Sequence, residues 1–321
     1  MDRQQLVVLA MGAAHKAHKE FGVNPTSRVD VFRVLRQVGA DVFFRPLRSI
    51  YGAYLPTGDS IPGLLINSNL PLSVQRFTAA HELGHLYLGH KTASLEKGLD
   101  FTPEERSGTD PDEVVAEAFG AFFLMPRPLV KASITELGIN EKRIDSPDVY
   151  LLALQMGTSY AATVNQLQTL KIVHPAQARE LRKQVPKEIK QKINDEKAVG
   201  RHDVWLLNES WNGKEIFPAV MDTIRIQLKE TPTSGYTWSL QDQPVGVNVL
   251  EDTRKGPEEA GIGGTQVHEF VAALAENASD STLTLQKKRP WEQGSVKGEF
   301  SVQIRPQELR KTGPLVVPKI A

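Results

Sequence analysis

The spacing of apolar and polar residues divides the chain into two parts of different character. Before about residue 195, apolar residues recur mainly at the spacing of helices that cover a core. Two short strands, 41–46 and 63–67, interrupt this part around a loop rich in glycine and proline. Capping and helix-breaking residues give the expected helices: one ending at Gly22, then Ser27 to about Gly39, one beginning near Ser73, Pro111 to Pro126, 149–156, 160–170 and 175–194.

After about Gly200 the period changes to two. Segments such as 223–228, 282–286 and 299–304 alternate apolar and polar residues between turns rich in glycine, proline and serine. This pattern predicts an antiparallel β sandwich. All four tryptophans lie in this part, which indicates a separate core. We therefore predict a multidomain α+β protein with a mostly helical domain, a β sandwich and a tail, over residues 1–198, 199–310 and 311–321.

Composition narrows the chemistry. The 38 basic and 38 acidic side chains cancel, so no global field draws the chain to nucleic acid or to an anionic membrane. The chain has no cysteine, which excludes disulfides, thiolate metal sites and cysteine nucleophiles. Residues 6–14 lack the features of a signal peptide, and no apolar run approaches the length of a membrane span. We expect a cytoplasmic protein whose metal site, if present, uses His, Asp or Glu.

The sharpest chemical signal is an H-E-x-x-H sequence at His81, Glu82 and His85. On a helix, residues four apart lie on one face, so both imidazoles can reach one ion while Glu82 contacts a water molecule on it. The pattern also arises by chance, and helical histidines are often simply surface or core residues. The apolar and small neighbours Ala79, Ala80, Leu83 and Gly84 favour a buried site. His90 follows His85 by five positions, so we interpret it as a surface or cap residue.

A third ligand is expected from the next helix. Glu113 and Glu117 lie one turn apart on a single face, so one could bind the metal while the other orients a ligand imidazole. The alternative is that both are solvated glutamates near a helix N-terminus, where the helix dipole favours negative charge.

The residues around these carboxylates and histidines resemble a known family. The run RFTAAHELGHLYLGH over residues 76–90, followed by E-x-x-A-E-x-F-G-x-x-F-L-M-P over 113–126, is similar to the ImmA/IrrE metallopeptidases. The resemblance covers roughly residues 5–175. It implies that His81, His85 and Glu113 bind Zn²⁺, that Glu82 is the catalytic base, and that the substrate is a helix-turn-helix repressor. Glu117 replaces the family's asparagine, and its contact with a ligand imidazole stays a prediction.

The helix pair 149–170 has the look of a helix-turn-helix motif, and a basic stretch follows it. The other interpretation is that the pair completes the peptidase core. We favour the core interpretation, because the second helix offers Asn165 and Gln166 to bases but no arginine, and a similar stretch is usual in the family that the chain resembles. Direct binding of nucleic acid is therefore not expected.

Three motifs of the β-rich part fall in loops. They are TPTSGYTW from Thr231, GIGG over 261–264 and RPWE from Arg289, and Trp238 and Trp291 are either exposed in these loops or core residues. Together the motifs resemble the chagasin-type inhibitors of papain-like cysteine proteases, which have an immunoglobulin-like fold. The resemblance implies protease-binding loops formed by Pro232, Thr233, Ser234, Gly235, Tyr236, Gly261, Gly263, Gly264, Arg289, Pro290 and Trp291.

Two functions from different classes follow. The first is a zinc metalloendopeptidase in which the sandwich recognises a protein. The second is a binding protein that inhibits a papain-like cysteine protease and uses its zinc site for structure or regulation. A DNA-binding regulator that uses residues 149–201 is a third and weaker hypothesis.

Overall fold

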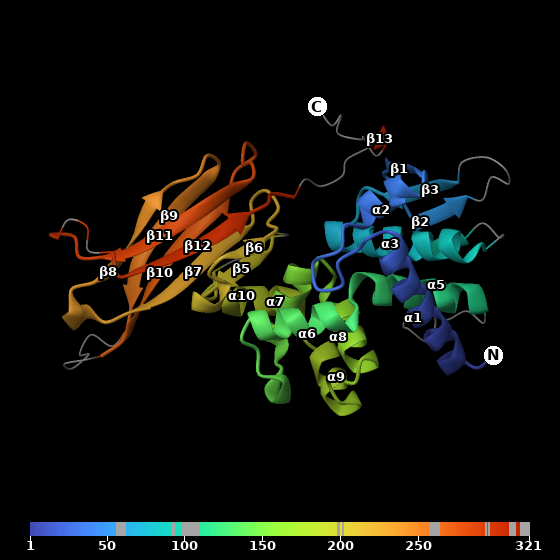
Figure 1. Cartoon of the computed structure of the whole chain (residues 1–321), viewed down its shortest axis with the longest axis horizontal. Helices are drawn as coiled ribbons and strands as arrows, with labels where there is room; N and C mark the ends of the chain where they lie inside the picture. Colours follow the sequence, from blue (N-terminus) through green and yellow to red (C-terminus); the bar gives the residue numbers. More distant parts are fainter. Residues whose placement is uncertain are drawn as a thin grey trace. The chain divides into compact units, whose positions relative to one another are not determined.

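The protein is described by a computed structural model (Figure 1). The described residues are 1–55, 62–90, 94–97, 110–197, 200, 202–256, 264–292, 294, 296–307 and 313–314. They form two compact units that alternate along the chain. The first unit is residues 1–134, 155–182 and 309–321, and the second is 135–154 and 183–308. No helix in the described ranges combines the length and the apolar character needed to cross a bilayer.

The first unit contains a five-stranded mixed sheet in the order β13-β1-β3-β2-β4. Strands β1 (Asp41–Arg45) and β3 (Gly63–Asn67) are the two expected strands, and they pair in parallel. Strand β2 (Ile50–Leu55) pairs antiparallel with β3 and with β4 (Ser94–Lys97), and β13 (Gly313–Pro314) extends the other edge. The expectation of a loop over 50–55 is wrong, because Gly52 lies inside a strand instead of a turn.

The helices of this unit follow the capping residues. Helix α1 (Arg3–Glu20) begins with a capping box between Asp2 and Gln5, and α2 (Val31–Gln37) begins after Asp30. Helix α5 (Pro111–Leu124) starts at Asp110, whose side chain accepts from the Asp112 N–H, and it ends before Pro126. The others are α3 (Leu72–Leu88), α6 (Arg127–Glu136), α8 (Tyr160–Thr169) and α9 (Pro175–Arg182), while most of α7 (Ser146–Met156) belongs to the second unit.

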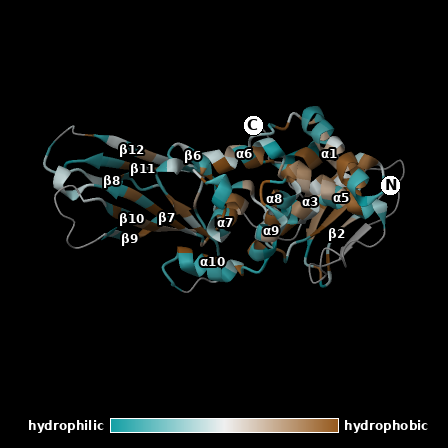
Figure 2. Ribbon diagram, turned by 90° about the horizontal axis from the view of Figure 1, so that it is seen from below, coloured by the Kyte–Doolittle hydropathy of each residue, from teal (hydrophilic) through white to brown (hydrophobic). Residues whose placement is uncertain are grey.

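The core of the first unit lies around α3 and α5, along which hydrophobic residues are concentrated (brown in Figure 2). Helix α1 packs against α5, where His18 Nε2 lies 2.8 Å from the carbonyl oxygen of Phe123. The predicted single helix over 175–194 is instead two helices, α9 and α10 (Pro186–Ile193). Pro186 cannot continue a helix and holds Val185 in an extended conformation, which explains the break.

The second unit is a sandwich of two four-stranded sheets (Figure 1). One sheet has the order β5-β7-β10-β9 and the other β6-β12-β11-β8. Inner positions alternate with outer ones, as at Ile224, Ile226 and Leu228 or at Phe300, Val302 and Ile304, all of which are buried. The strands are β5 (Val204–Leu207), β6 (Lys214–Ile216), β7 (Thr223–Glu230), β8 (Thr237–Asp242), β9 (Val247–Lys255), β10 (Gln266–Leu274), β11 (Ser281–Lys288) and β12 (Gly298–Ile304).

The predicted fold class, a multidomain α+β protein with a mostly helical first part and a C-terminal β sandwich, is confirmed. The sandwich departs from the expected antiparallel pattern at two edges. Strand β5 pairs in parallel with β7, and β6 pairs in parallel with β12. Each of these short edge strands comes before its partner in the chain and is not joined to it by a tight hairpin.

Helical residues also belong to the second unit. The Tyr150 hydroxyl lies 3.1 Å from Asp203 Oδ1 and 2.9 Å from the Val204 N–H, and Lys190 forms an ion pair with Asp203. The buried guanidinium of Arg225 binds Glu269 at 2.6 Å and also contacts Asp195, which lies just after α10. These contacts fix residues before position 199 to the strands. The predicted domain boundary at residue 198 stays a prediction.

Asp222 is the most strongly perturbed carboxyl group of the sandwich. Its buried oxygens accept from the Asp203 N–H at 2.8 Å, the Ala219 N–H at 2.8 Å and Trp205 Nε1 at 3.3 Å. Burial and the nearby charge of Asp203 raise the pKa of Asp222 from 3.8 to about 7. The folded state therefore keeps this carboxyl protonated over a pH range in which the unfolded chain has lost the proton.

We expect this proton to make stability depend on pH. Because the folded pKa is raised, the contribution of Asp222 is fully present below pH 3.8 and is lost as the pH rises toward 7. The expected slope is at most about 1.4 kcal/mol per pH unit. Asp222→Asn should remove that slope in urea unfolding measured at several pH values across this window, whereas the exposed Asp242→Asn should retain it. An unchanged slope in Asp222→Asn would contradict this prediction.

Candidate metal centre and binding loops

Helix α3 carries both histidines of the H-E-x-x-H sequence on its buried face. His81 and His85 are four residues apart, and their Nε2 atoms lie 3.0 Å from each other. Glu82 is fully buried on the neighbouring face. A glutamate and two imidazoles on one buried helix need polar partners, because burial removes the water that would otherwise solvate them.

Helix α5 supplies the third donor. Glu113 Oε2 lies 3.3 Å from His81 Nε2, and Oε1 lies 3.6 Å from His85 Nε2. Within the described residues, these three side chains form a cluster whose ligand atoms all lie within 4.8 Å of one another. Burial works against the charge of Glu113, but hydrogen bonds and charge interactions with the two histidines outweigh it and hold the pKa of that carboxyl well below its usual range.

Two glycines allow α3 and α5 to approach closely at this cluster. A side-chain carbon at Gly84 would lie 3.2 Å from the Ala116 Cα, and one at Gly120 would lie 3.1 Å from the His81 nitrogen. Both distances are tighter than ordinary carbon contacts. Small residues at these two positions therefore set the helix separation that brings Glu113 to the histidines.

Strand β2 passes beside the same helix. A side-chain carbon at Gly52 would lie 2.4 Å from Thr78 Cγ2, 2.8 Å from the Leu65 oxygen and 3.3 Å from Glu82 Oε1. Only glycine fits there. Two residues further along β2, the Tyr54 ring is stacked on His85 with centroids 6.3 Å apart. This role of β2 was not predicted from sequence, because Gly52 falls in a stretch rich in glycine and proline that indicates a loop.

The predicted contact of Glu117 with a ligand imidazole stays a prediction. His90 contacts His85, with 2.8 Å between the two Nδ1 atoms. Of the two interpretations, surface or cap residue, the structure favours the cap: the His90 N–H donates to the His85 carbonyl oxygen at 3.0 Å, and only 11% of the side chain is exposed. Burial and the neighbouring His85 lower the pKa of His90.

The helix pair 149–170 contributes to the core. Gln166 is buried, and its Nε2 donates to the Met125 carbonyl oxygen at 3.0 Å. Asn165 Oδ1 accepts from Arg182 Nε at 2.9 Å. Since the two side chains that base readout would use are occupied within the fold, the arrangement favours the interpretation that the second helix of the pair, α8, belongs to the core of the first unit.

In the sandwich, two of the three sequence motifs lie side by side. Residues Pro232–Ser234 form a short 3-10 helix that ends at Gly235, which has a left-handed φ of 73°. A side-chain carbon at Gly235 would lie 2.8 Å from the Trp291 ring, so the two loops touch at that point. The Arg289 guanidinium lies over the Tyr236 ring, with its Cζ 4.6 Å from the ring centroid.

The two tryptophans in question have different environments. Trp291 is 73% exposed, whereas Trp238 is buried and donates from Nε1 to the Lys229 carbonyl oxygen. Trp291 is thus a loop residue and Trp238 a core residue. In the remaining motif, GIGG, Gly264 precedes β10, while Gly261 and Gly263 lie outside the described residues.

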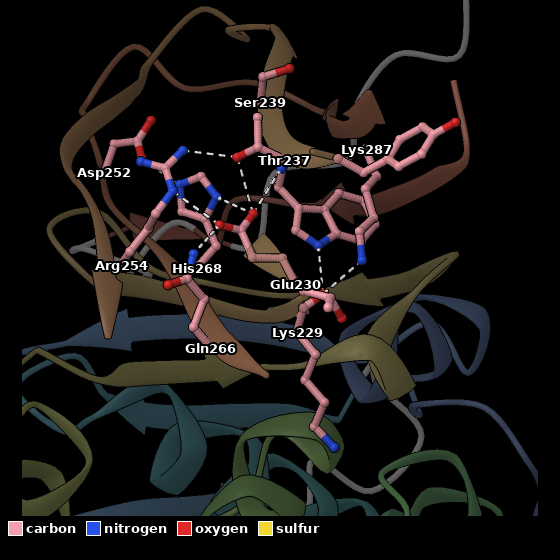
Figure 3. Close-up of polar contacts among 12 residues, drawn as sticks. Lys229, Glu230, Thr237, Ser239, Asp252, Arg254, Gln266, His268 and Lys287 are labelled. Carbon is pink, nitrogen blue, oxygen red and sulfur yellow. Dashed lines mark hydrogen bonds and ion pairs between the residues drawn. The ribbon is translucent and has the colours of Figure 1, made fainter. Parts of the chain in front are cut away.

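A buried glutamate that the sequence analysis missed supports the first loop from below (Figure 3). Glu230 Oε2 accepts from Thr237 Oγ1 at 3.0 Å and from the Trp238 N–H at 3.2 Å. Oε1 accepts from Arg254 at 3.0 Å and Gln266 at 2.7 Å. His268 Nδ1 lies 3.1 Å from Oε2, and its Nε2 lies 2.6 Å from Asp252. One carboxylate therefore joins both ends of the first loop to β9 and β10.

We expect Glu230→Ala to destabilise the sandwich by about 1–3 kcal/mol, because it removes the acceptor of the buried Trp238 N–H and the partner of the buried His268 Nδ1. The measurement is the free energy of unfolding from urea titrations. Glu276→Ala is the matched control, since Glu276 is an exposed glutamate of the same unit and should change stability by no more than about 0.5 kcal/mol. Equal stability of the two variants would show that the network around Glu230 contributes little.

Comparison with known proteins gives two matches that do not overlap. Residues 35–167 match the Peptidase M78 family, described as the IrrE N-terminal-like domain. Residues 219–304 match the chagasin family peptidase inhibitor I42. The first match includes the histidine cluster and Glu113, and the second includes the two loops that meet at Gly235.

Individual relatives match the sandwich. Amoebiasin-2 of Entamoeba histolytica is 26% identical over 92 residues, which is 28% of this chain and 75% of that protein. A crystal structure of a cysteine protease inhibitor from Entamoeba histolytica is 22% identical with a TM-score of 0.31, and it covers 34% of this chain and 100% of that one. The solution structure of Amebosin is 23% identical with a TM-score of 0.27, over the same shares of both chains.

PbICP-C, solved in complex with falcipain-2, is 17% identical with a TM-score of 0.22, over 34% of this chain and 96% of its own. The chain thus joins a metallopeptidase-like domain of the IrrE N-terminal type to a domain of the chagasin peptidase inhibitor family.

Proposed function

We propose that the chain is a zinc-dependent endopeptidase in which His81, His85 and Glu113 bind the ion and Glu82 is the general base. The observation that carries this proposal is the convergence of two imidazole nitrogens and one carboxylate from two buried helices on one point. The arrangement holds only three protein donors in the described residues, which is the number that leaves a zinc coordination position open for chemistry.

The donor set fits zinc. Two neutral imidazoles and one carboxylate make up a common catalytic zinc site, whereas magnesium and calcium prefer oxygen donors alone. The depressed pKa of Glu113 keeps this donor ionised, as a ligand must be. A bound zinc ion would supply Lewis acidity toward a water molecule and a peptide carbonyl.

The protein side chains would do the rest. Glu82 Oε1 lies beside β2, next to the histidine cluster, in a fully buried position. From there its carboxylate would take a proton from the attacking water and return it to the leaving amine. Stacking of Tyr54 against His85 and the close packing at Gly52 would keep the ring and the carboxylate in place.

For the substrate we propose a protein, and specifically a helix-turn-helix repressor, as the resemblance to ImmA/IrrE peptidases implies. The test is incubation of the zinc-loaded chain with a repressor encoded beside it, followed by mass spectrometry of the products. A single cut that a chelator prevents is the expected result. Intact repressor and intact unfolded casein after prolonged incubation would contradict the endopeptidase proposal.

A second function belongs to the sandwich: binding of a papain-like cysteine protease. The exposed Trp291 beside Gly235 and the match to the chagasin inhibitor family favour it. Because this chain contains no cysteine, such a target must be another protein. The sandwich could thereby recruit a partner to the peptidase, or it could be the main activity of a chain whose zinc site is structural. Inhibition of papain without any metal-dependent cleavage would select the second possibility.

A further inference from the structure

After helix α3 the chain turns back toward the helix, so that the following residues contact His85, a proposed zinc ligand. The helix stops at Leu88, and Gly89 takes a left-handed φ of 70°. The Gly89 N–H donates to the Leu86 carbonyl oxygen at 3.2 Å, and the His90 N–H donates to the His85 carbonyl oxygen at 3.0 Å. This pair of bonds defines a Schellman motif, in which the residue after the left-handed glycine packs on the residue five positions earlier. That contact is usually hydrophobic, but here it joins two imidazoles.

The contact is polar and continues to α5. His90 Nδ1 lies 2.8 Å from His85 Nδ1, and the two rings meet at 72° with centroids 4.9 Å apart. The other nitrogen of His90, Nε2, lies 3.5 Å from Asp112 Oδ1. Asp112 is in the first turn of α5, directly before Glu113. A line of polar groups therefore runs from Asp112 through His90 to the back of the His85 ring.

Proton placement along this line has one solution that leaves His85 able to bind a metal. His85 Nε2 faces His81 and Glu113, so it must offer a lone pair there, and the ring proton must sit on Nδ1. That proton points at His90 Nδ1, which must then accept. The proton of His90 is consequently on Nε2, where it faces the carboxylate of Asp112. The reverse order would put the His85 proton on Nε2, where it would block the metal position.

We propose that His90, supported by Asp112, is a positioning residue that fixes His85 in the tautomer and orientation needed to bind a divalent ion. This inference rests on the proposed zinc centre. Neither residue would contact a bound ion; both would act on it through the ring of His85. Outer partners of this kind commonly set metal affinity, because they hold the ligand ring and raise its basicity.

The test is zinc affinity, measured on the full chain by competition with a chromogenic chelator. His90→Phe keeps an apolar contact in the Schellman motif but cannot accept the Nδ1 proton, so zinc binding should weaken about 10–100-fold. His90→Asn places an amide oxygen near the position of Nδ1 and should restore most of that loss. His15→Phe, at an exposed histidine of α1, should bind zinc like the wild type.

Two further measurements separate positioning from a general loss of structure. Urea unfolding of the metal-free proteins should give similar midpoints for wild type and His90→Phe, because the apolar contact is retained. In the zinc-loaded wild type, long-range ¹H–¹⁵N spectra of imidazole should show His85 protonated at Nδ1. Wild-type affinity in His90→Phe would overturn this inference alone, whereas wild-type affinity in His81→Ala would overturn the zinc centre itself.

Discussion

Replacing Glu82 with glutamine is expected to abolish measurable proteolysis while zinc binding stays within about twofold of the wild type. Glutamine has nearly the shape of glutamate but cannot take a proton from water at neutral pH. Loss of a positioned general base typically lowers a rate by about 10²–10⁴-fold. The measurements are kcat for cleavage of the protein substrate and zinc content after gel filtration.

Contrast with a proposed ligand makes this experiment sharper. Glu113→Gln should lose both zinc and activity, because its carboxylate is the donor that lies within 3.3–3.6 Å of both histidine nitrogens. Glu20→Gln is the matched control, since that carboxylate binds the Tyr87 hydroxyl and lies outside the cluster. Wild-type turnover by Glu82→Gln would remove Glu82 from the role of base. Loss of zinc from Glu82→Gln would indicate that Glu82 is itself a ligand.

Local spacing explains why much of the cluster of His81, His85 and Glu113 could be predicted from sequence. The relation between His81 and His85 depends only on the helical repeat, and the helix that carries Glu113 was predicted from Pro111 and Pro126. The spacing made Glu113 and Glu117 equal candidates as ligands. In the structure the Glu113 carboxylate lies 3.3 Å from His81 Nε2 and 3.6 Å from His85 Nε2, while the contact of Glu117 stays a prediction.

The relation between His90 and His85 could not be read in the same way. Counting residues around a helix places position 90 on another face, but the count fails once Gly89 leaves the helix and turns the chain back. A left-handed glycine after a helical run is a sequence signal for that return, and it is the signal that was available. Gly52 is the opposite case, because this glycine allows close packing inside a strand and does not form a turn.

The polar networks of the sandwich were beyond prediction for a different reason. Glu230 gathers partners from positions 237 to 268, and Asp222 gathers partners from 203 to 219, on separate strands and loops. Single-sequence spacing carries no information on which strands become neighbours or on their register. The alternation of apolar residues predicted the strands and the inner face, but not the burial of a glutamate among them.

Removing the two aromatic loop residues should have the second large effect. We expect Tyr236→Ala combined with Trp291→Ala to weaken papain inhibition by at least about 30-fold, the equivalent of about 2 kcal/mol. Large aromatic side chains that become buried in a partner dominate such interfaces. Trp291 is 73% exposed in the free chain, so its burial by a partner would remove a large apolar surface from water.

The measurement is inhibition of papain by full-length chains that all carry Glu82→Gln, so that cleavage of papain cannot be mistaken for inhibition. Val245→Ala is a suitable control, because Val245 is 72% exposed in the same unit but lies outside the three motifs. Unfolding midpoints of all variants are measured alongside, because Tyr236 is half-buried under the Arg289 guanidinium and a loss of structure must be distinguished from a loss of binding. Wild-type inhibition by the double variant would show that other residues bind the protease. Absence of inhibition by the parent chain would leave the sandwich a recognition module for a different protein, with recruitment of the peptidase substrate as its remaining role.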